Sequence, residues 1–363
     1  MTLSITAAVA DPSRGAGSAP KLEALSLRTP REGEVLVKIK AVGICHTDFF
    51  AGSLSEGPMV PGHEGAGIIE AVGPGVDKGR IGQRVALTFD SCGHCPRCVD
   101  DDPAYCDSAL ALQFGLDETM QRPNGQGIAG GFFKQSSFAT HALATARNAI
   151  PIPDELPFHL AAPLGCGVQT GYGAVVNEIK PLPDETLVIF GLGAVGLSAI
   201  SAASYVGVKR IIGIDPIEAR RTLALEMGAA EVFAPSAVGS GTLQGRIAHC
   251  AIDCAGTAQT FQQSLDMLKP RGKLGVVAVP PPDKPISFVP LTLLDGGRQV
   301  IGIVEGGSDP VRFIPELGKR SLDGTLPLEK MIKRYAFKDF AQAWADAENG
   351  RTIKPVLMME DSA

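Results

Sequence analysis

The sequence predicts a two-domain protein in which a parallel, doubly wound α/β domain lies between two parts of a β-rich domain. A length of 363 residues is too long for one comfortable core. The 43 glycines and 27 prolines indicate many turns, and short β-like runs dominate the first part of the chain. From about residue 168 to 303, apolar strands alternate with helical segments, which is typical of βαβ units.

The β-rich domain is expected to comprise residues 1–167 and 304–363. Residues 34–40 alternate apolar and polar side chains, which predicts a half-buried strand, and residues 65–72 form a second β-like run. Residues 117–131 are polar and rich in glycine, so an exposed loop is predicted there. The final stretch has mixed structure and is expected to pack on the first.

The α/β domain is expected to comprise residues 168–303. Residues 186–190 predict a buried strand, which a glycine-rich turn and an alanine-rich helix through about Val206 follow. Further strands are predicted at 210–215, near 231–233, at 251–253 and at 272–278, with helices that end at Met227 and lie near 258–268.

Composition argues against several kinds of partner and location. The net charge is −6 and the 33 Lys and Arg residues form no dense run, which argues against nucleic acid and membrane surfaces. No stretch of about eighteen apolar residues predicts a transmembrane helix. The first ten residues lack the pattern of a signal peptide, so a reducing cytoplasm is expected and clustered cysteines are interpreted as metal ligands.

A dinucleotide-binding motif, Gly191-Leu-Gly193-Ala-Val195-Gly196, follows a predicted strand and opens a predicted helix. The glycines permit a tight turn, close approach of a pyrophosphate and close helix–strand packing, and the helix N-terminus faces the phosphate charge. Asp215 ends the next strand, where its carboxylate can bind both adenosine ribose hydroxyls and repel a 2′-phosphate. This predicts NAD in preference to NADP. Arg220 and Arg221 can tolerate NADP, but they are expected to be exposed on the following helix. The simpler alternative is a glycine-rich turn with a capping aspartate.

Two groups of metal-ligand residues occur in the predicted β-rich domain. Four cysteines within fifteen residues can close a tetrahedron around Zn²⁺ and leave no position for substrate, which predicts a structural site: Cys92, Cys95, Cys98 and Cys106. Cys45, His63 and Cys166 each lie in a glycine-flanked turn and would leave one zinc position open. Taken singly, each has an ordinary structural explanation. Cys250 and Cys254 are interpreted as buried thiols beside a strand of the cofactor domain.

Together these motifs resemble the zinc-dependent medium-chain alcohol dehydrogenases over essentially the whole chain. The resemblance rests on Gly62-His63-Glu64, the four-cysteine lobe at 92–106 and the glycine motif. Within the family the chain most resembles the bacterial aryl-alcohol (benzyl alcohol) dehydrogenases, through Pro103-Ala-Tyr-Cys-Asp107, Phe133-Lys-Gln-Ser-Ser-Phe-Ala-Thr140, Pro163-Leu-Gly-Cys-Gly-Val-Gln-Thr-Gly171 and Ile303-Val-Glu-Gly306. The resemblance implies a GroES-like catalytic domain formed by both ends of the chain and a Rossmann domain between them.

The resemblance also implies roles for individual residues. Cys45, His63 and Cys166 would hold a catalytic zinc that activates the alcohol oxygen, and Thr47 would relay its proton while hydride passes to NAD. Asp48 would orient His63 as a partner behind the metal, and Glu64 matches an acidic residue behind the zinc. His46 and Lys354 match positions that meet the cofactor pyrophosphate. The alternative for Lys354 is a solvated C-terminal charge.

One position departs from the family pattern and the substrate is less well defined. Phe50 stands where many relatives place the histidine that ends the proton relay, so the relay is expected to end differently, with a changed pH dependence. The resemblance implies an aryl or allylic primary alcohol. Phe49, Phe89 and Phe114 are candidates to line its pocket, although core packing is the usual place of a phenylalanine.

Other functions stay open at this stage. A relative acting on an aliphatic alcohol, a terpenoid alcohol or a glutathione adduct of formaldehyde is the nearest alternative. A non-enzymatic zinc protein would explain the cysteine lobe alone, and a zinc-free reductase would lack these ligands. The resemblance implies two zinc ions per subunit and a homodimer or homotetramer, with a contact edge near residues 299–304 that suits two-fold pairing.

Overall fold

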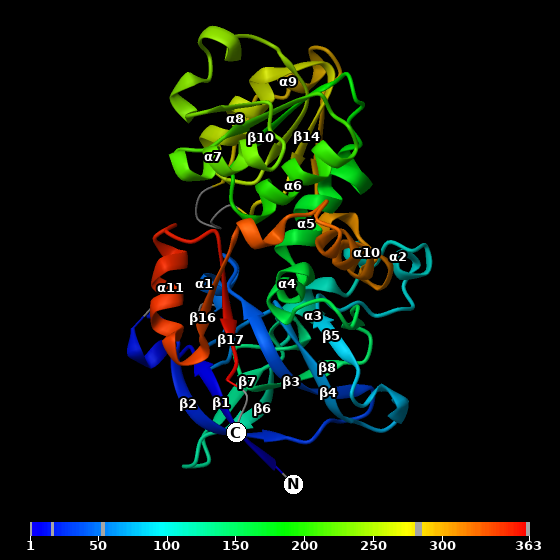
Figure 1. Cartoon of the computed structure of the whole chain (residues 1–363), viewed down its shortest axis with the longest axis vertical. Coiled ribbons are helices and arrows are strands. Elements are labelled where there is room, and N and C mark those ends of the chain that lie inside the picture. Colours follow the sequence, from blue (N-terminus) through cyan, green and yellow to red (C-terminus); the bar gives the residue numbers. More distant parts are fainter. Residues whose placement is uncertain (1, 16–17, 52–54, 280–284, 361–363) are drawn as a thin grey trace. The chain divides into compact units, whose positions relative to one another are not determined.

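The computed structural model describes residues 2–15, 18–51, 55–279 and 285–360. These residues form two compact units (Figure 1). Unit 1 comprises Met1–Cys166, Asp309–Asp323 and Met331–Ala363, and unit 2 comprises Gly167–Ser308 and Gly324–Lys330. The expectation that residues 304–308 and 324–330 belong to the β-rich domain was therefore wrong. These segments pack with the α/β elements, a contact that the local sequence pattern does not reveal.

Unit 2 is built around one parallel sheet of six strands in the order β12-β11-β10-β13-β14-β15, which confirms the doubly wound α/β prediction. The central strand β10 is buried at every residue, as its unbroken apolar sequence predicted. The strands are β10 (Thr186–Phe190), β11 (Arg210–Ile214), β12 (Glu231–Phe233), β13 (Ala248–Asp253), β14 (Leu268–Val276) and β15 (Gln299–Gly302). The helices are α5 (Gly167–Gly173), α6 (Ala194–Tyr205), α7 (Glu218–Glu226), α8 (Ala258–Met267) and α9 (Leu291–Leu294).

Unit 1 contains two sheets around a shared apolar core. The larger runs β16-β17-β3-β4-β5-β9, with β8 paired to β3, and the smaller runs β1-β2-β6-β7. Half-buried and buried side chains alternate along the first part of β3, and Val35, Val37 and Ile39 are the buried ones. The strands are β1 (Thr2–Val9), β2 (Lys21–Arg28), β3 (Glu34–Gly43), β4 (Gly65–Val72), β5 (Arg84–Leu87), β6 (Asp117–Gln121), β7 (Gly127–Gly130), β8 (His141–Thr145), β9 (Ala149–Pro151), β16 (Ile332–Ala336) and β17 (Lys354–Met358). The helices are α1 (Asp48–Ala51), α2 (Pro96–Val99), α3 (Ala109–Phe114), α4 (Phe158–Ala161), α10 (Pro310–Leu322) and α11 (Phe340–Glu348).

The predicted exposed loop at 117–131 was wrong, because this segment forms the antiparallel pair β6 and β7. Its two large apolar side chains, Met120 and Ile128, are 3% and 0% exposed and belong to the core of unit 1. The polar and glycine residues between them obscure the alternation that marks a strand. Pairing of β6 with β2, which lies far away in sequence, supplies the burial that local composition does not indicate.

None of the helices in the described ranges is long and apolar enough to cross a membrane.

An acid-sensitive ion pair joins the end of β1 to the turn of the β6–β7 hairpin. Asp11 accepts hydrogen bonds from Ser13 Oγ at 2.6 Å and from Arg122 Nη2 at 2.8 Å. These bonds lower the pKa of the Asp11 carboxyl to about 2. Because this pKa lies below the usual value of about 4, the pair stabilises the fold above pH 4 and loses this effect as the pH falls toward 2.

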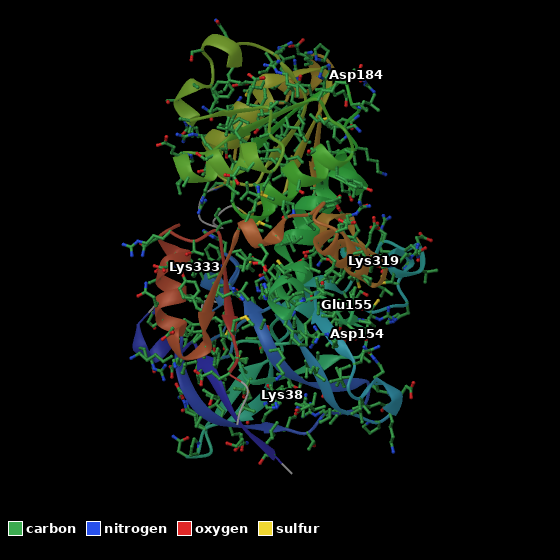
Figure 2. The ribbon with its side chains drawn as sticks, viewed as in Figure 1. Lys38, Asp154, Glu155, Asp184, Lys319 and Lys333 are labelled. Atoms are coloured by element: carbon green, nitrogen blue, oxygen red, sulfur yellow. The ribbon has the colours of Figure 1, made fainter. Side chains whose placement is uncertain are left out.

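We therefore expect Asp11→Asn to lower the free energy of unfolding by about 1–2 kcal/mol at pH 6, and by about half as much at pH 3. Urea unfolding at the two pH values measures the difference. Asp154→Asn is the matched control, because Asp154 is exposed in unit 1 (Figure 2) and should change stability little. An equal loss at both pH values for Asp11→Asn would contradict the assignment.

Candidate metal and cofactor sites

Three separate segments of unit 1 bring Cys45, His63 and Cys166 together. Cys45 follows β3, His63 precedes β4, and Cys166 follows the short helix Ala162–Gly165. The ligand atoms of these residues and of Glu64 all lie within 4.8 Å of one another. The Sγ atoms of Cys45 and Cys166 are 4.0 Å apart. Each ligand thus lies within two residues of the end or start of a regular element, so the fold of unit 1 positions all three.

Asp48 connects two of these segments. Its Oδ1 lies 2.8 Å from Nδ1 of His63 and accepts the backbone N–H of Gly62, and its Oδ2 accepts the N–H of Cys45 at 2.9 Å. The buried carboxylate therefore favours the tautomer with the proton on Nδ1 and leaves the lone pair of Nε2 for a ligand. Nε2 is buried and has no hydrogen-bond partner among the described residues. This is the geometry expected of a metal-binding histidine.

The donor set fits a zinc ion. Two thiolates bound to one tetrahedral zinc ion at the usual Zn–S length of about 2.3 Å would have their sulfur atoms about 3.8 Å apart. The Sγ atoms of Cys45 and Cys166 are 4.0 Å apart, which is close to this value. A disulfide would require about 2.05 Å. A hydrogen bond shared with Cys166, together with the nearby His63 ring, holds the pKa of the Cys45 thiol well below its usual value despite burial. A lowered pKa makes the thiolate readily available, and the thiolate is the form of cysteine that binds a metal.

Glu64 and Lys354 form a fully buried ion pair beside these ligands. Lys354 Nζ lies 2.7 and 2.8 Å from the two Glu64 carboxylate oxygens and donates to the carbonyl of Ile44 at 3.2 Å. A side chain at Gly43 would collide with the Glu64 carboxylate, which explains the glycine there. Burial raises the pKa of Glu64, and the Lys354 charge partly offsets this effect.

The alternative of a solvated terminal charge for Lys354 was wrong, because its side chain is 3% exposed. Its ammonium contacts both oxygens of the Glu64 carboxylate and the carbonyl of Ile44. A role of Lys354 at the cofactor pyrophosphate stays a prediction. The pairing of β17 with β3 places Lys354 and Glu64 together, across 290 residues of sequence.

We expect Lys354→Met to destabilise the protein by about 3–5 kcal/mol, because it leaves the Glu64 carboxylate buried without its counter-charge. The double variant Lys354→Met with Glu64→Gln should recover much of that loss. Urea unfolding measures both, and Lys319→Met, at an exposed position on α10 (Figure 2), is the control with little effect. A loss below about 1 kcal/mol for Lys354→Met would contradict the proposed importance of the pair.

Gln135 holds the His63 segment in place, and the sequence interpretation assigned it no role. The side chain is 1% exposed; its Nε2 donates to the carbonyls of His63 and Thr88, and its Oε1 accepts the N–H of Gly65. The flanking residues Lys134 and Ser136 adopt left-handed backbone angles, with φ of 51° and 49°. Strain of this kind in residues with side chains marks functional positions, but it is visible only in the structure.

The four lobe cysteines also lie within metal-binding distance, all four Sγ atoms within 4.8 Å of one another. The Sγ separations are 4.0 Å between Cys92 and Cys98 and 3.9 Å between Cys95 and Cys106. Backbone N–H groups point at the sulfur atoms, including those of Cys95 to Cys92 and of Cys92 to Cys106. The N–H groups of Cys98 and Asp107 lower the pKa of Cys95 to about 6. The lobe thus fits a second, closed zinc site.

Each of the three glycines of the 191–196 motif in unit 2 is required for a different structural reason. Gly191 has a φ of 85°, and a side chain on Gly196 would lie 1.9 Å from the carbonyl of Gly191. A side chain on Gly193 would meet no atom within 4 Å, so the backbone is open at the N-terminus of α6. Val195 lies in the first turn of this helix. The arrangement matches a pyrophosphate cradle, with backbone N–H groups at a helix start.

Asp215 follows β11, directly beside the strand that carries the glycine motif. Its carboxylate is 2% exposed and accepts the N–H groups of Leu192 and Ile217, both at 2.8 Å. The expectation that Arg220 and Arg221 are exposed was wrong. Arg220 is 21% exposed and lies 3.9 Å from Asp215, and Arg221 donates to the carbonyl of Asp215. The first turn of α7 folds both side chains back toward the strand end.

Comparisons with known proteins now identify the family. Residues 31–154 match the alcohol dehydrogenase GroES-like domain, and residues 194–317 match the zinc-binding dehydrogenase domain. The chain belongs to the zinc-dependent medium-chain alcohol dehydrogenases. The family resemblance and the GroES-like and Rossmann-like fold class are thereby confirmed, and the non-enzymatic alternative loses its support.

Relatives extend over nearly the whole of this alcohol dehydrogenase. It is 40% identical to geraniol dehydrogenase of Castellaniella defragrans, with 95% of this chain and 96% of that protein covered. It is 37% identical to the crystal structure of benzyl alcohol dehydrogenase from Acinetobacter calcoaceticus, with a TM-score of 0.90 and coverage of 99% and 100%. An alcohol dehydrogenase zinc-binding domain protein from Burkholderia ambifaria is 38% identical, with a TM-score of 0.91 and the same coverage.

Aromatic side chains surround the His63 end of the dehydrogenase's ligand set. The Phe133 ring stacks on the His63 ring with centroids 4.6 Å apart and an interplanar angle of 26°. Phe132 meets His63 edge-on at 5.6 Å, and Phe114 contacts both phenylalanines. Phe89 is 4% exposed and belongs to the same apolar cluster.

The expected pocket residues therefore separate into two groups. Phe89 and Phe114 lie with Phe132 and Phe133, which the sequence interpretation did not include. Phe49 lies elsewhere, with its ring 4.6 Å from that of Trp344 and 5.3 Å from that of His46. His46 is exposed, and the Phe50 side chain is 47% exposed.

Proposed function

We propose that the chain is an NAD- and zinc-dependent dehydrogenase of primary alcohols whose reacting carbon is attached to an aromatic ring or an allylic double bond. The observation that carries the proposed reaction is the open ligand set of Cys45, His63 and Cys166, in which Asp48 orients the His63 ring. The Phe133 ring stacks on His63, so the surroundings of this ligand set are apolar and aromatic. Two relatives are named for their substrates, geraniol and benzyl alcohol, which belong to these two classes.

The proposed chemistry assigns a task to each residue around the ligand set. Cys45, His63 and Cys166 would hold a zinc ion and leave one position for substrate, while Asp48 keeps the His63 ring oriented. When bound, zinc supplies Lewis-acid polarisation of an alcohol oxygen, and NAD supplies the hydride acceptor. Thr47 Oγ1, 3.9 Å from the Cys45 sulfur, would accept the alcohol proton through a hydrogen bond and pass it on. Phe50 has no atom that can carry a proton, so we propose that the relay ends at the cofactor ribose and water.

The same proposal covers cofactor choice and zinc content. Asp215 beside the glycine motif favours NAD, because its charge repels a 2′-phosphate. The family's zinc dependence together with two tetrahedral ligand groups supports two zinc ions per subunit.

We propose a homodimer or homotetramer. The strand β15 lies at the edge of the unit 2 sheet. Nearby apolar side chains of unit 2 are strongly exposed, with Val289, Leu291 and Leu294 at 65–76%. Exposed edges and apolar residues of this kind commonly meet a second copy. Sedimentation analysis tests the assembly.

The first test is NADH formation, followed at 340 nm, with benzyl, cinnamyl, geranyl and short aliphatic alcohols. We expect turnover that is highest on the aryl or allylic members and that a zinc chelator abolishes. Activity confined to aliphatic alcohols would retain the reaction and discard the proposed substrate class. Dependence on added glutathione with formaldehyde would indicate the glutathione-adduct alternative. No NAD-linked turnover with any member would overturn the proposed reaction.

A further inference from the structure

Glu305 has an unusual backbone conformation just after the edge strand of unit 2. The φ angle of Glu305 is 47°, and those of the following Gly306 and Gly307 are 68° and 54°. Three consecutive residues thus lie in the left-handed region, which favours glycine and disfavours residues with side chains. The first of the three is nevertheless a glutamate. The backbone gives no reason for a side chain at this position, so its carboxylate requires another explanation.

The turn is attached closely to the helix α5. A side chain on Gly306 would lie 2.4 Å from the carbonyl of Gln169, so the two backbones are in direct contact. Glu305 Oε2 accepts hydrogen bonds from Gln169 Nε2 and Thr170 Oγ1, both at 3.2 Å, and Ser308 Oγ donates to the carbonyl of Glu305 at 2.7 Å. Gln169 is completely buried. These hydrogen bonds hold the carboxylate in one place against α5.

Strand register places Glu305 beyond the carboxyl ends of the parallel strands, where a dinucleotide would bind. Phe190, Asp253, Val276 and Gly302 are successive partners across β10, β13, β14 and β15, and Glu305 comes three residues after this row. Dinucleotides bind outside the carboxyl ends of such strands. The glycine motif follows β10, and Asp215 follows β11 on one side of it. If Asp215 marks the adenosine half of NAD, the nicotinamide half extends over β13 to β15, toward Glu305.

We propose that Glu305 is a specificity-determining residue whose negative charge makes the cofactor site favour NAD⁺ over NADH. This inference rests on the proposed function, since it requires NAD as the cofactor. The two forms carry the same phosphates and differ in ring charge, because the nicotinamide ring is cationic in NAD⁺ and neutral in NADH. A glutamate carboxylate is negatively charged at neutral pH and stabilises only the cationic ring.

The test compares affinities for the two cofactor forms by calorimetry for NAD⁺ and by fluorescence enhancement for NADH, with no alcohol present. Glu305→Gln keeps an oxygen that can accept from Gln169 and Thr170 and removes only the charge. We expect NAD⁺ to bind about tenfold more weakly to this variant, the size expected for opposite charges some ångströms apart in partly solvated surroundings, and NADH to change less than about twofold. Glu305→Gly, which suits the left-handed backbone, should repeat the pattern if the glutamine variant is unstable.

Glu185→Gln is the matched control. Glu185 is half-buried and directly precedes β10, so it lies at the amino ends of the strands, away from the carboxyl ends where Glu305 lies. A five-residue strand separates the two ends by about 16 Å, which exceeds the Debye length of about 8 Å at physiological salt. Its substitution should leave the NAD⁺/NADH affinity ratio unchanged. An unchanged ratio in Glu305→Gln, or an equal loss for both forms, would overturn the proposal while the NAD-dependent function stands. Failure of the unmodified protein to bind either form would instead overturn the proposed cofactor and this inference with it.

Discussion

Replacing Cys166 by serine is expected to lower alcohol turnover by at least about 10³-fold while the protein stays folded. The physical reason is the loss of one of the two thiolates that, with His63, form the open ligand set. Metal polarisation of the substrate contributes several kcal/mol to such reactions, which corresponds to a rate factor of this size. NADH formation with benzyl alcohol measures the loss, and zinc analysis of the same sample should show one zinc ion fewer per chain.

Cys250→Ser is the matched control for this experiment. Cys250 is 3% exposed on β13 and lies in neither group of metal ligands. Its substitution should leave zinc content unchanged and cost at most the modest stability of a buried thiol. Normal activity in Cys166→Ser would show that the catalytic-zinc assignment is wrong. Loss of activity with full zinc content would indicate that the serine oxygen retains the ion in an unproductive geometry.

Replacing Cys106 by serine is expected to act mainly on stability. Cys106 is a buried ligand of the four-cysteine lobe, and its sulfur also accepts the backbone N–H groups of Cys92 and Ser108. Metal binding contributes directly to the folding of such lobes, so the variant should lose one zinc ion and unfold roughly 10 °C earlier. Thermal unfolding followed by circular dichroism measures the shift.

Hydrogen exchange distinguishes a local effect of Cys106→Ser from a general one. Faster exchange should concentrate in residues 91–113, because two hydrogen bonds between Asp90 and Gln113 close off this segment from the rest of unit 1. Residual turnover per folded molecule should stay near the original value, because the open ligand set uses other residues. An unchanged zinc count and unfolding temperature would contradict the structural-zinc assignment of the lobe.

Much of the fold followed from local sequence patterns. Strands β10 to β14 and helices α6 to α8 of unit 2 have apolar runs whose structural requirements are local, and the structure contains them near where the sequence predicted. The glycines at 191–196 likewise follow a local requirement. The sequence did not predict α5, α9 and β15. The spacing of the four lobe cysteines is also local, because all lie within fifteen residues. The strands β6 and β7 were missed because their burial comes from pairing with β2, and a hairpin of polar and glycine residues looks like a loop until that partner is known.

The tertiary structure decided which distant residues share an environment. Sequence alone proposed Cys45, His63 and Cys166 as ligands through their resemblance to a family, and chain folding brings their ligand atoms within 4.8 Å. The pairing of Lys354 with Glu64 contradicted the alternative of a solvated terminal charge, because the carboxylate that compensates the buried ammonium lies 290 residues away in sequence. Gln135 and Glu305 gained their proposed roles only from contacts and backbone angles. Residue type and spacing determine the chemistry a segment can offer, whereas the long-range packing of strands and turns decides which groups meet and which charges are compensated.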